Sequence, residues 1–255
     1  MRRQTKAKSD PPESALYLYG ISRAGMSAPA RVMNPSIDGG HPVHAVLSGD
    51  FVCWVSAVDG DEFSEEINRN MENLEWLALH GVRHQQVVAE IAAKTAIVPA
   101  RFGTVFSGGQ ALLKNVQGRK AALKKVFTRI AGADEWGVKV FDEKRTVSQV
   151  PPDIRSGKEY LQAKAARLNR PPDRDDSGLR EFAAALKKIA TESAPTGKIS
   201  GAQPDLLWQA TFLVPRGRQK IWDQTLKRFV KQWSGSRRIE VNGPWPPYSF
   251  VSDAE

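Results

Sequence analysis

Residues 43–59 decide the expected fold and read Val-His-Ala-Val-Leu-Ser-Gly-Asp-Phe-Val-Cys-Trp-Val-Ser-Ala-Val-Asp. Apolar and β-branched residues fill Val43 to Ser48 and Phe51 to Asp59, and the turn-forming pair Gly49-Asp50 separates the two runs. Two such runs joined by two turn residues are typical of an antiparallel hairpin. The stretch therefore predicts two paired strands in a chain that mixes strands with helices.

The residues around this hairpin predict an N-terminal α+β domain over 15–131, with a small mixed or antiparallel sheet. Its other predicted elements are a strand at 15–21, a short helix capped by Asp61, a helix over 71–94, a strand at 96–102 and a helix from Gly108-Gly109 to about residue 130. Pro99 lacks a backbone donor, so it indicates an edge position or the end of its strand. Residues 1–14 are expected to be a disordered tail.

The second half predicts a C-terminal α+β domain of ferredoxin-like type over 132–242, with a helical insertion. Its predicted elements are a strand at 135–141, helices at 156–169 and 178–193, a flexible loop at 194–204, a strand at 205–214, a helix at 216–233 and a strand at 238–241. Pro171-Pro172 forbids one continuous helix through the insertion. The helix at 216–233 has an apolar side, for which we expect Ile221, Leu226, Phe229, Val230 and Trp233.

Composition indicates a globular chain of one large or two modest domains. The 255 residues are 41% hydrophobic and 25% charged. The single cysteine, Cys53, excludes an intramolecular disulfide and fits a reducing compartment. No apolar run approaches the ~20 residues that cross a bilayer, and no apolar segment follows the basic N-terminus before Pro11-Pro12. We therefore expect a cytoplasmic protein.

The formal net charge of +9 raises nucleic acid or another anionic surface as a partner. Residues 214–240 carry eight Lys and Arg side chains against Asp223 and Glu240. One interpretation is a solvated helix face. The alternative is a nucleic-acid-binding module at 216–238, in which Trp222 and Trp233 stack on bases between the cations.

Motifs for catalysis and metal binding are weak. His80 and His84 have the i, i+4 spacing of metal ligands, but Gly81 stands where a zinc protease carries its glutamate, so packed histidines are favoured. Gly103 and Gly108 have the glycine spacing of a phosphate-binding loop, whereas Gly109 and Gln110 replace its lysine and hydroxyl. An anion- or nucleotide-using enzyme at 103–110 is the less favoured alternative, and we expect no enzyme and no cofactor.

Five stretches occur together in one order over residues 15–251. They are Leu16-Tyr-Leu-Tyr-Gly-Ile21, Glu72-Asn-Leu-Glu-Trp76 with the trailing His84, Val98-Pro-Ala-Arg-Phe-Gly-Thr-Val-Phe106, Glu135-Trp-Gly-Val-Lys-Val140 and Gly243-Pro-Trp-Pro-Pro-Tyr-Ser-Phe-Val251. In this order they resemble the GvpL/GvpF family of gas vesicle proteins. Ala100 departs from the family, which usually has a leucine before this arginine. The segments 22–42 and 170–204 match nothing in the family.

The resemblance implies a minor structural or assembly protein of gas vesicles, associated with the vesicle in the cytoplasm. Its implied partners are the hydrophobic major wall protein, GvpA, and other gas vesicle accessory proteins, with no cofactor and no catalytic residue. An unassembled wall protein exposes β-prone apolar surface that aggregates unless another protein covers it. The candidate partner-binding residues are Arg101, Phe102, Trp136, Trp245, Tyr248 and Phe250.

The proline-rich ending at 243–255 permits two interpretations. Prolines at 244, 246 and 247 remove three backbone donors, so 244–247 is excluded from a central strand. Tyr248 and Phe250 then alternate with smaller residues, which predicts a short edge strand. Either the ending packs Trp245 into the chain's own fold, or it presents an exposed anchor to a partner.

Overall fold

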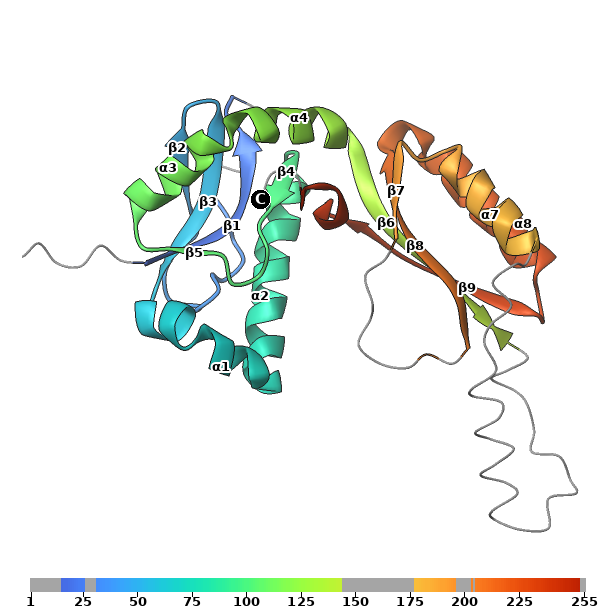
Figure 1. Ribbon diagram of the computed structural model, residues 1–255, viewed down its shortest axis with the longest axis horizontal. Coiled ribbons are helices and arrows are strands. Elements are labelled where there is room, and N and C mark those ends of the chain that lie inside the picture. Colours follow the sequence, from blue (N-terminus) through green and yellow to red (C-terminus); the bar gives the residue numbers. More distant parts are fainter. Residues whose placement is uncertain (1–14, 26–30, 144–176, 196–202, 204, 253–255) are drawn as a thin grey trace, which may run out of the picture. The chain divides into compact units, whose positions relative to one another are not determined.

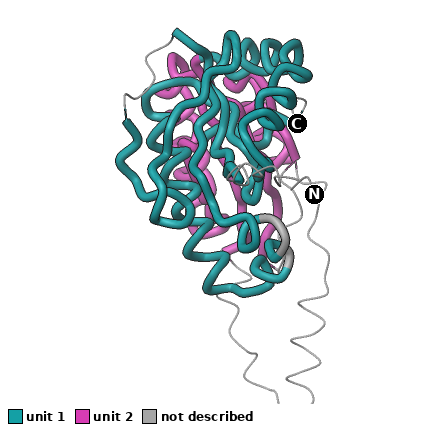
Figure 2. Tube along the Cα trace, turned by 90° about the vertical axis from the view of Figure 1, so that its left-hand side faces the viewer, with its two compact units in different colours: residues 1–131, 246–255 teal, residues 132–245 magenta. Residues whose placement is uncertain are grey.

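The computed structural model describes residues 15–25, 31–143, 177–195, 203 and 205–252 (Figure 1). These residues form two compact units, which are coloured separately in Figure 2. Unit 1 combines the described residues of 1–131 with those of 246–255, and unit 2 contains the described residues of 132–245. Unit 1 is therefore made from two separate parts of the chain.

The described part of unit 1 contains a five-stranded antiparallel sheet. Its strands are β1 (Ala15–Arg23), β2 (His44–Ser48), β3 (Phe51–Val58), β4 (Ile97–Pro99) and β5 (Val105–Phe106). The order is β2-β3-β1-β4, and β5 also pairs with β1. The predicted hairpin is confirmed, since Ser48 lies opposite Phe51 and Gly49 takes a φ of 60° that favours glycine. The strand predicted at 96–102 is shorter and ends at Pro99.

Strand β1 has a bulge between Leu18 and Gly20, and a different strand pairs with it on either side of this bulge. Residues 16–17 pair with β5, and residues 20–22 pair with β4. A Cβ atom on Gly20 would lie 2.6 Å from Cδ1 of Ile97 and 2.8 Å from the Val98 carbonyl oxygen. Glycine at this position therefore allows β4 to approach β1 closely.

The helices of unit 1 differ from the predicted ones in where they break. A π-helical turn covers Asp61–Glu65, followed by α1 (Ile67–Glu72), α2 (Leu74–Ala92), α3 (Gly109–Gly118) and α4 (Lys120–Ile130). The helix predicted from 71 starts at Leu74 because Asn73 is extended and caps α2, accepting hydrogen bonds from the backbone nitrogens of Glu75 and Trp76. The single helix predicted from Gly109 to 130 is wrong, since α3 ends at Gly118, a poor helix former, and α4 begins after Arg119.

The two faces of the unit 1 sheet are covered by different helices. Tyr17 and Tyr19 of β1 pack in one core with residues of α2 that include Val88. On the other face, Phe51 stacks on Phe127 of α4 with ring centroids 5.9 Å apart. Side chains alternate between faces along a strand, so Leu18 points toward the α3 and α4 side.

The described part of unit 2 is a four-stranded antiparallel sheet with two helices packed against it (Figure 1). Its elements are β6 (Ala133–Asp142), α7 (Ser177–Lys187), β7 (Glu192–Ala194), β8 (Leu206–Pro215), a 3-10 turn at Arg216–Arg218, α8 (Gln219–Gln232) and β9 (Arg237–Trp245). The strand order is β7-β8-β6-β9. Phe182 of α7 and Trp222 of α8 are completely buried, and their rings contact Trp208 and Phe212 of β8, respectively.

Three predictions in unit 2 are only partly correct. The helix predicted at 178–193 ends at Lys187, and the strand β7 follows it. β7 pairs with β8, but its three residues, Glu-Ser-Ala, are too few and too polar to show the alternating apolar pattern of a strand. The buried side of α8 is Trp222, Leu226, Phe229 and Trp233, whereas Ile221 and Val230 are exposed. The final strand predicted at 238–241 continues to Trp245, at the edge of the sheet. The helix predicted at 156–169 lies outside the described residues.

The predicted edge strand at Tyr248 and Phe250 is also wrong. Residues Tyr248–Phe250 form a 3-10 turn in unit 1, and the Phe250 backbone nitrogen donates to the Pro247 carbonyl oxygen at 3.1 Å. Pro246 and Pro247 are buried, and the chain turns here because the Tyr248 backbone nitrogen donates to the Pro246 carbonyl oxygen at 2.8 Å. The exclusion of 244–247 from a central strand holds, since Pro244 and Trp245 lie on the edge strand β9.

Candidate functional site

Four sequence motifs meet around His84 in unit 1. We call this group the His84 cluster: Tyr17 of β1, Trp76 and His84 of α2, Phe102 of the segment after β4, and Tyr248 of the C-terminal turn. The Phe102 ring lies 6.4 Å from Tyr17, 6.0 Å from Trp76 and 5.9 Å from His84, measured between ring centroids. The Tyr17 and His84 centroids are 5.7 Å apart with the rings edge to face. Such tilted and edge-to-face contacts are the favoured geometry of aromatic pairs.

A continuous chain of hydrogen bonds runs through the His84 cluster. The Gly103 backbone nitrogen donates to the Tyr17 hydroxyl at 3.1 Å, and that hydroxyl lies 2.9 Å from Nδ1 of His84. The Tyr248 hydroxyl lies 3.2 Å from Nε2 of His84 and donates to Oε1 of Gln85 at 2.8 Å. Because the Tyr248 hydroxyl donates its hydrogen bond to Gln85, Nε2 of His84 is the protonated nitrogen, and Nδ1 accepts a hydrogen bond from the Tyr17 hydroxyl. Each polar group in this series of hydrogen bonds thus has a partner.

The electrostatics of the cluster keep it uncharged. Burial lowers the pKa of His84 to about 4, although a hydrogen bond with the backbone of Ala100 acts in the opposite direction. Burial also raises the pKa of the Tyr17 hydroxyl far above its usual value. A neutral histidine that satisfies two tyrosines holds β1, α2 and the C-terminal turn together. The expectation that His84 is a packed histidine is confirmed.

The segment 100–104 fills the gap between β4 and β5 along β1. The Ala100 backbone nitrogen donates to the Tyr19 carbonyl oxygen, and the Leu18 backbone nitrogen donates to the Thr104 carbonyl oxygen, both at 2.9 Å. Gly103 takes a φ of 82°, which favours glycine, and a Cβ there would lie 3.1 Å from Cδ1 of Ile67. This turn directs Phe102 into the His84 cluster and leaves Arg101 exposed.

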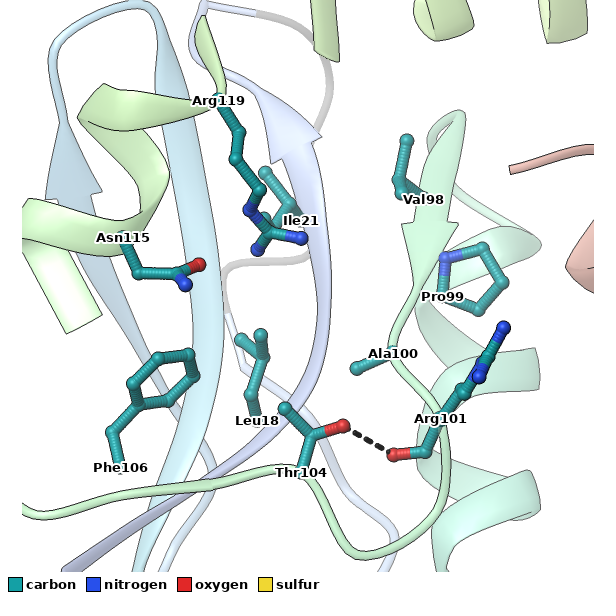
Figure 3. A pocket seen from close by; sticks show the side chains of 10 residues that line it. All are labelled: Leu18, Ile21, Val98, Pro99, Ala100, Arg101, Thr104, Phe106, Asn115 and Arg119. Carbon is teal, nitrogen blue, oxygen red and sulfur yellow. Dashed lines mark hydrogen bonds between the residues drawn. The ribbon is translucent and has the colours of Figure 1, made fainter. Parts of the chain in front are cut away.

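A pocket of about 290 Å³ adjoins this turn on the α3 side of the sheet (Figure 3). Buried apolar residues such as Leu18, Ile21 and Val98 line it, and Arg119 reaches into it from the end of α3. Arg101 lines the opposite side of the pocket from Arg119. Guanidinium groups bind carboxylates, so this lining suits an apolar group that lies next to a carboxylate.

Exposed apolar side chains also gather on the outer side of α1 and α2. We call Met71, Leu74, Leu79 and Val82 the apolar row. Their exposed fractions are 42%, 78%, 50% and 56%, respectively. Leu74 and Val82 are eight residues apart, with the exposed Ala78 midway, so they lie along one side of α2. Leu79 lies beside Val82, three residues before it, and the acidic residues Glu72 and Glu75 lie among them.

The other candidate residues have different environments. Phe250 is buried in unit 1, and its carbonyl oxygen accepts a hydrogen bond from Arg129 at 2.5 Å. Trp136 is half-buried in unit 2, and its ring lies against Gly243, where a Cβ would be 3.0 Å from Cε3. Trp245 is 44% exposed and pairs with Glu135 across β9 and β6. The six candidates are divided between the two units: Arg101, Phe102, Tyr248 and Phe250 belong to unit 1, and Trp136 and Trp245 belong to unit 2.

The motifs considered for metal or phosphate have structural partners. His80 is buried, and its Nδ1 lies 2.8 Å from the Trp76 carbonyl oxygen. In the part of the chain that the structure describes, no three His, Cys, Asp or Glu side chains are grouped as a metal would require. Residues 103–110 contain the Gly103 turn, β5 and the start of α3 rather than one continuous loop. No helix of the described residues is both long and apolar enough to cross a membrane.

Sequence reasoning missed the apolar row and the pairing of His84 with two tyrosines. Leu74 and Leu77 are three residues apart in one apolar helical stripe, which predicts that both are buried, yet Leu74 is exposed at the start of α2. The signal for the row was the surplus of apolar residues on α2: more of them than one buried stripe can contain. The contact between residues 84 and 248 has no signal in a single sequence.

Two solved structures share this fold. The crystal structure of the gas vesicle protein GvpF from Anabaena sp. PCC7120 aligns with a TM-score of 0.66 and 22% identity, over 94% of this chain and 97% of that chain. The structure of GvpF from Microcystis aeruginosa aligns with a TM-score of 0.65 and 21% identity, over 94% of this chain and 99% of that chain. The chain therefore has the α+β fold of these two structures.

The family match is equally broad. The profile of the family described as "Gas vesicle synthesis protein GvpL/GvpF" matches residues 15–252. Gas vesicle protein L of Streptomyces sp. (strain CB03234) is 29% identical over 235 residues, which cover 85% of this chain and 86% of the relative. Gas vesicle protein F of the same organism is 28% identical over 92% of this chain and 98% of the relative. The chain belongs to the GvpL/GvpF family and takes part in gas vesicle formation, and this family is one of structural and assembly proteins.

Proposed function

We propose that the protein is a minor structural or assembly protein of gas vesicles that binds the hydrophobic, GvpA-type wall protein during vesicle nucleation or assembly. The apolar row carries this proposal. Contiguous exposed apolar side chains mark interaction sites on proteins of this size. A helix with such a surface can cover an apolar segment of a partner, as in helix-in-groove recognition.

The energy of the apolar row indicates that it does not act alone. Complete burial of a Leu, Val or Met side chain contributes about 1.5–3 kcal/mol. The four side chains are already about half covered, so their burial against a partner adds on the order of 4 kcal/mol. Ordering the partner offsets part of that gain. A stable complex therefore needs a second contact.

The free edge of β2 supports such a second contact. β2 is the outer strand of the unit 1 sheet, and it pairs with β3 alone among the described residues. The pair Ser48–Phe51 closes the hairpin, so the backbone groups of Ala45 and Leu47 point away from β3. The Leu47 side chain is also exposed. An extended, β-prone segment of the wall protein fits this edge by strand addition.

The proposal includes the finer expectations about the chain. The βαββαβ element order of unit 2, with strand order β7-β8-β6-β9, supports a ferredoxin-like fold for a C-terminal domain that starts near residue 132. Among the candidate contact residues, we propose Arg101 and Trp245 because they are exposed. We also propose that the protein works in the cytoplasm in association with the vesicle.

Co-expression with the wall protein tests the proposal. The tagged chain is purified and the bound wall protein is quantified for the double variant Leu74→Gln, Val82→Gln. The matched control is Ile221→Gln, Val230→Gln, which replaces two exposed apolar residues on α8 of unit 2. We expect the first variant alone to retain less wall protein. Equal retention by the wild type and both variants would remove the apolar row from the proposal, and no wall protein with any of them would overturn the binding function itself.

A further inference from the structure

The excess positive charge of the chain is concentrated on the helical layer of unit 2. We use this name for α7 and α8 with their adjoining turns, residues 177–189 and 216–232, which cover one face of the sheet (Figure 1). The layer contains nine Lys and Arg side chains against Glu181 and Asp223, a net charge of +7, whereas the whole chain carries +9. The charge is thus a local property of one surface.

Two of these cations have structural roles. Arg216 makes a bidentate contact with Asp134, with nitrogen–oxygen distances of 2.9 to 3.2 Å. Arg218 donates to the carbonyl oxygens of Lys188 and Ile189 at the end of α7, at 3.4 and 3.1 Å. A cation at this position satisfies unpaired carbonyls of a helix C-terminus. Arg216 therefore joins the layer to β6, and Arg218 joins the two helices of the layer.

Three lysines of α8 have no such role. Lys220, Lys227 and Lys231 are exposed, and none of them forms an ion pair with a described residue. We call them the lysine stripe, because steps of seven and four residues place them on one side of α8, opposite its buried side. The carboxylate of Asp223 accepts a hydrogen bond from Gln219 at 2.9 Å and forms no ion pair with these three lysines. Like charges four residues apart destabilise a helix, so the stripe costs stability in the isolated protein.

We propose that the lysine stripe and the helical layer around it form a docking surface for an acidic segment of a partner protein. The argument is charge complementarity: a partner carboxylate relieves the repulsion among the lysines and gains their attraction. This surface is distinct from the apolar row, so the protein joins an apolar partner through unit 1 and an acidic partner through unit 2.

The same residues argue against nucleic acid as the occupant. Single-stranded nucleic acid is held by aromatic side chains on which its bases stack. Trp222 and Trp233 are buried in the core of unit 2, so the layer offers neither of them for stacking. The stripe also consists of lysines, which act as point charges, rather than of arginines, whose planar fork binds phosphate in a bidentate manner.

The test measures binding of a labelled glutamate-rich peptide to the full chain by fluorescence anisotropy. A peptide of about twelve residues is long enough to follow α8, which is ~21 Å long. The triple variant Lys220→Gln, Lys227→Gln, Lys231→Gln is compared with a control of equal charge, in which three exposed lysines of unit 1 are replaced. The control substitutions are Lys94→Gln, Lys114→Gln and Lys125→Gln. We expect about tenfold weaker binding for the stripe variant, an unchanged control, and a loss of binding as salt shortens the Debye length from ~30 Å to ~8 Å.

Two results would overturn the proposal. Equal weakening of both variants would show that net charge alone attracts the peptide. Tighter binding of duplex DNA, single-stranded RNA or anionic lipid vesicles than of the peptide, at the same salt, would assign the surface to that other polyanion. All substituted lysines are exposed, so both variants are expected to fold, and circular dichroism checks this.

Discussion

The hydroxyl of Tyr248 lies 3.2 Å from Nε2 of His84, although 164 residues separate the two in the chain. Nδ1 on the opposite side of the same ring meets the Tyr17 hydroxyl at 2.9 Å. A single neutral histidine thus joins the first strand of unit 1, its long helix and the last turn of the chain. The stability of unit 1 is expected to depend on this ring.

Tyr17→Phe is expected to destabilise the protein more than Tyr248→Phe. The first change leaves the Gly103 backbone nitrogen and Nδ1 of His84 without their partner inside the core, which costs about 1–3 kcal/mol. The second removes a hydroxyl that is only half-buried, so we expect a cost of about 1 kcal/mol. Urea unfolding of the two variants measures the difference, and the opposite order would contradict the hydrogen-bond chain.

Acid is expected to weaken the protein through His84 before it affects the carboxylates. The pKa of His84 is about 4 in the folded protein, against 6.5 for an unperturbed histidine, so the unfolded state binds the proton first. The stabilising effect is complete above pH 6.5 and is lost as the pH falls toward 4. Between about pH 7 and about pH 4.5 we expect a loss of about 2–3 kcal/mol. The pKa values of Asp38 and Glu90 are lowered from 3.8 and 4.5, so their losses lie at lower pH.

The variant His84→Gln serves as the control for this pH dependence. Glutamine does not titrate, so the free energy of unfolding of the variant is expected to change less over the same pH range. A variant that retains the full slope would assign the proton to another group.

Two glycine substitutions are expected to have opposite effects. Gly103→Ala places a side chain at a φ of 82° and within 3.1 Å of Ile67, which costs about 1–2 kcal/mol or more. Gly81→Ala adds a methyl group that meets no atom within 4 Å apart from its chain neighbours and the backbone of α2 itself, so it is expected to stabilise the helix by up to ~1 kcal/mol. Thermal unfolding distinguishes them by the sign of the shift in Tm, and equal shifts would contradict this account of Gly103.

The two aromatic residues of the C-terminal motif are expected to separate stability from binding. Phe250→Ala removes a buried ring from unit 1 and is expected to cost about 3–5 kcal/mol. Trp245→Ala removes a partly exposed ring from the edge strand β9, so we expect a clearly smaller loss. Chemical denaturation measures both. Reduced co-purification of the wall protein with a stably folded Trp245→Ala variant would support Trp245 as a contact residue, and unchanged co-purification would remove it.

Local sequence patterns correctly predicted the hairpin at 43–59, the helix α2 and the strand β6. In each of them the apolar residues recur at regular steps, and clear turn or cap residues mark the ends. The same patterns failed where long-range contacts decide. β7 has only three residues, and its sequence Glu-Ser-Ala shows no apolar alternation that would predict a strand. Tyr248 and Phe250 alternate like a strand, yet both side chains turn into unit 1, where His84 and Arg129 hold the segment.

The candidate site was predicted only in part. The Arg-Phe-Gly motif led to Arg101 and Phe102, and the turn at Gly103 explains why one is exposed and the other packs inward. The apolar row was missed because a helical period does not tell which of two apolar sides faces the core. The family motifs identified the residues of the His84 cluster, but the pairing of Tyr17 with Tyr248 through one imidazole depends on tertiary packing alone.

The return of the chain from unit 2 to unit 1 has a consequence for synthesis on the ribosome. Translation proceeds from the N-terminus, so Tyr248 and Phe250 emerge only after all of unit 2 has been made. Until then the first 131 residues lack the turn that covers His84. A chain that is truncated anywhere in unit 2 therefore lacks part of unit 1 as well. Both units can be completed only when the whole polypeptide has been released.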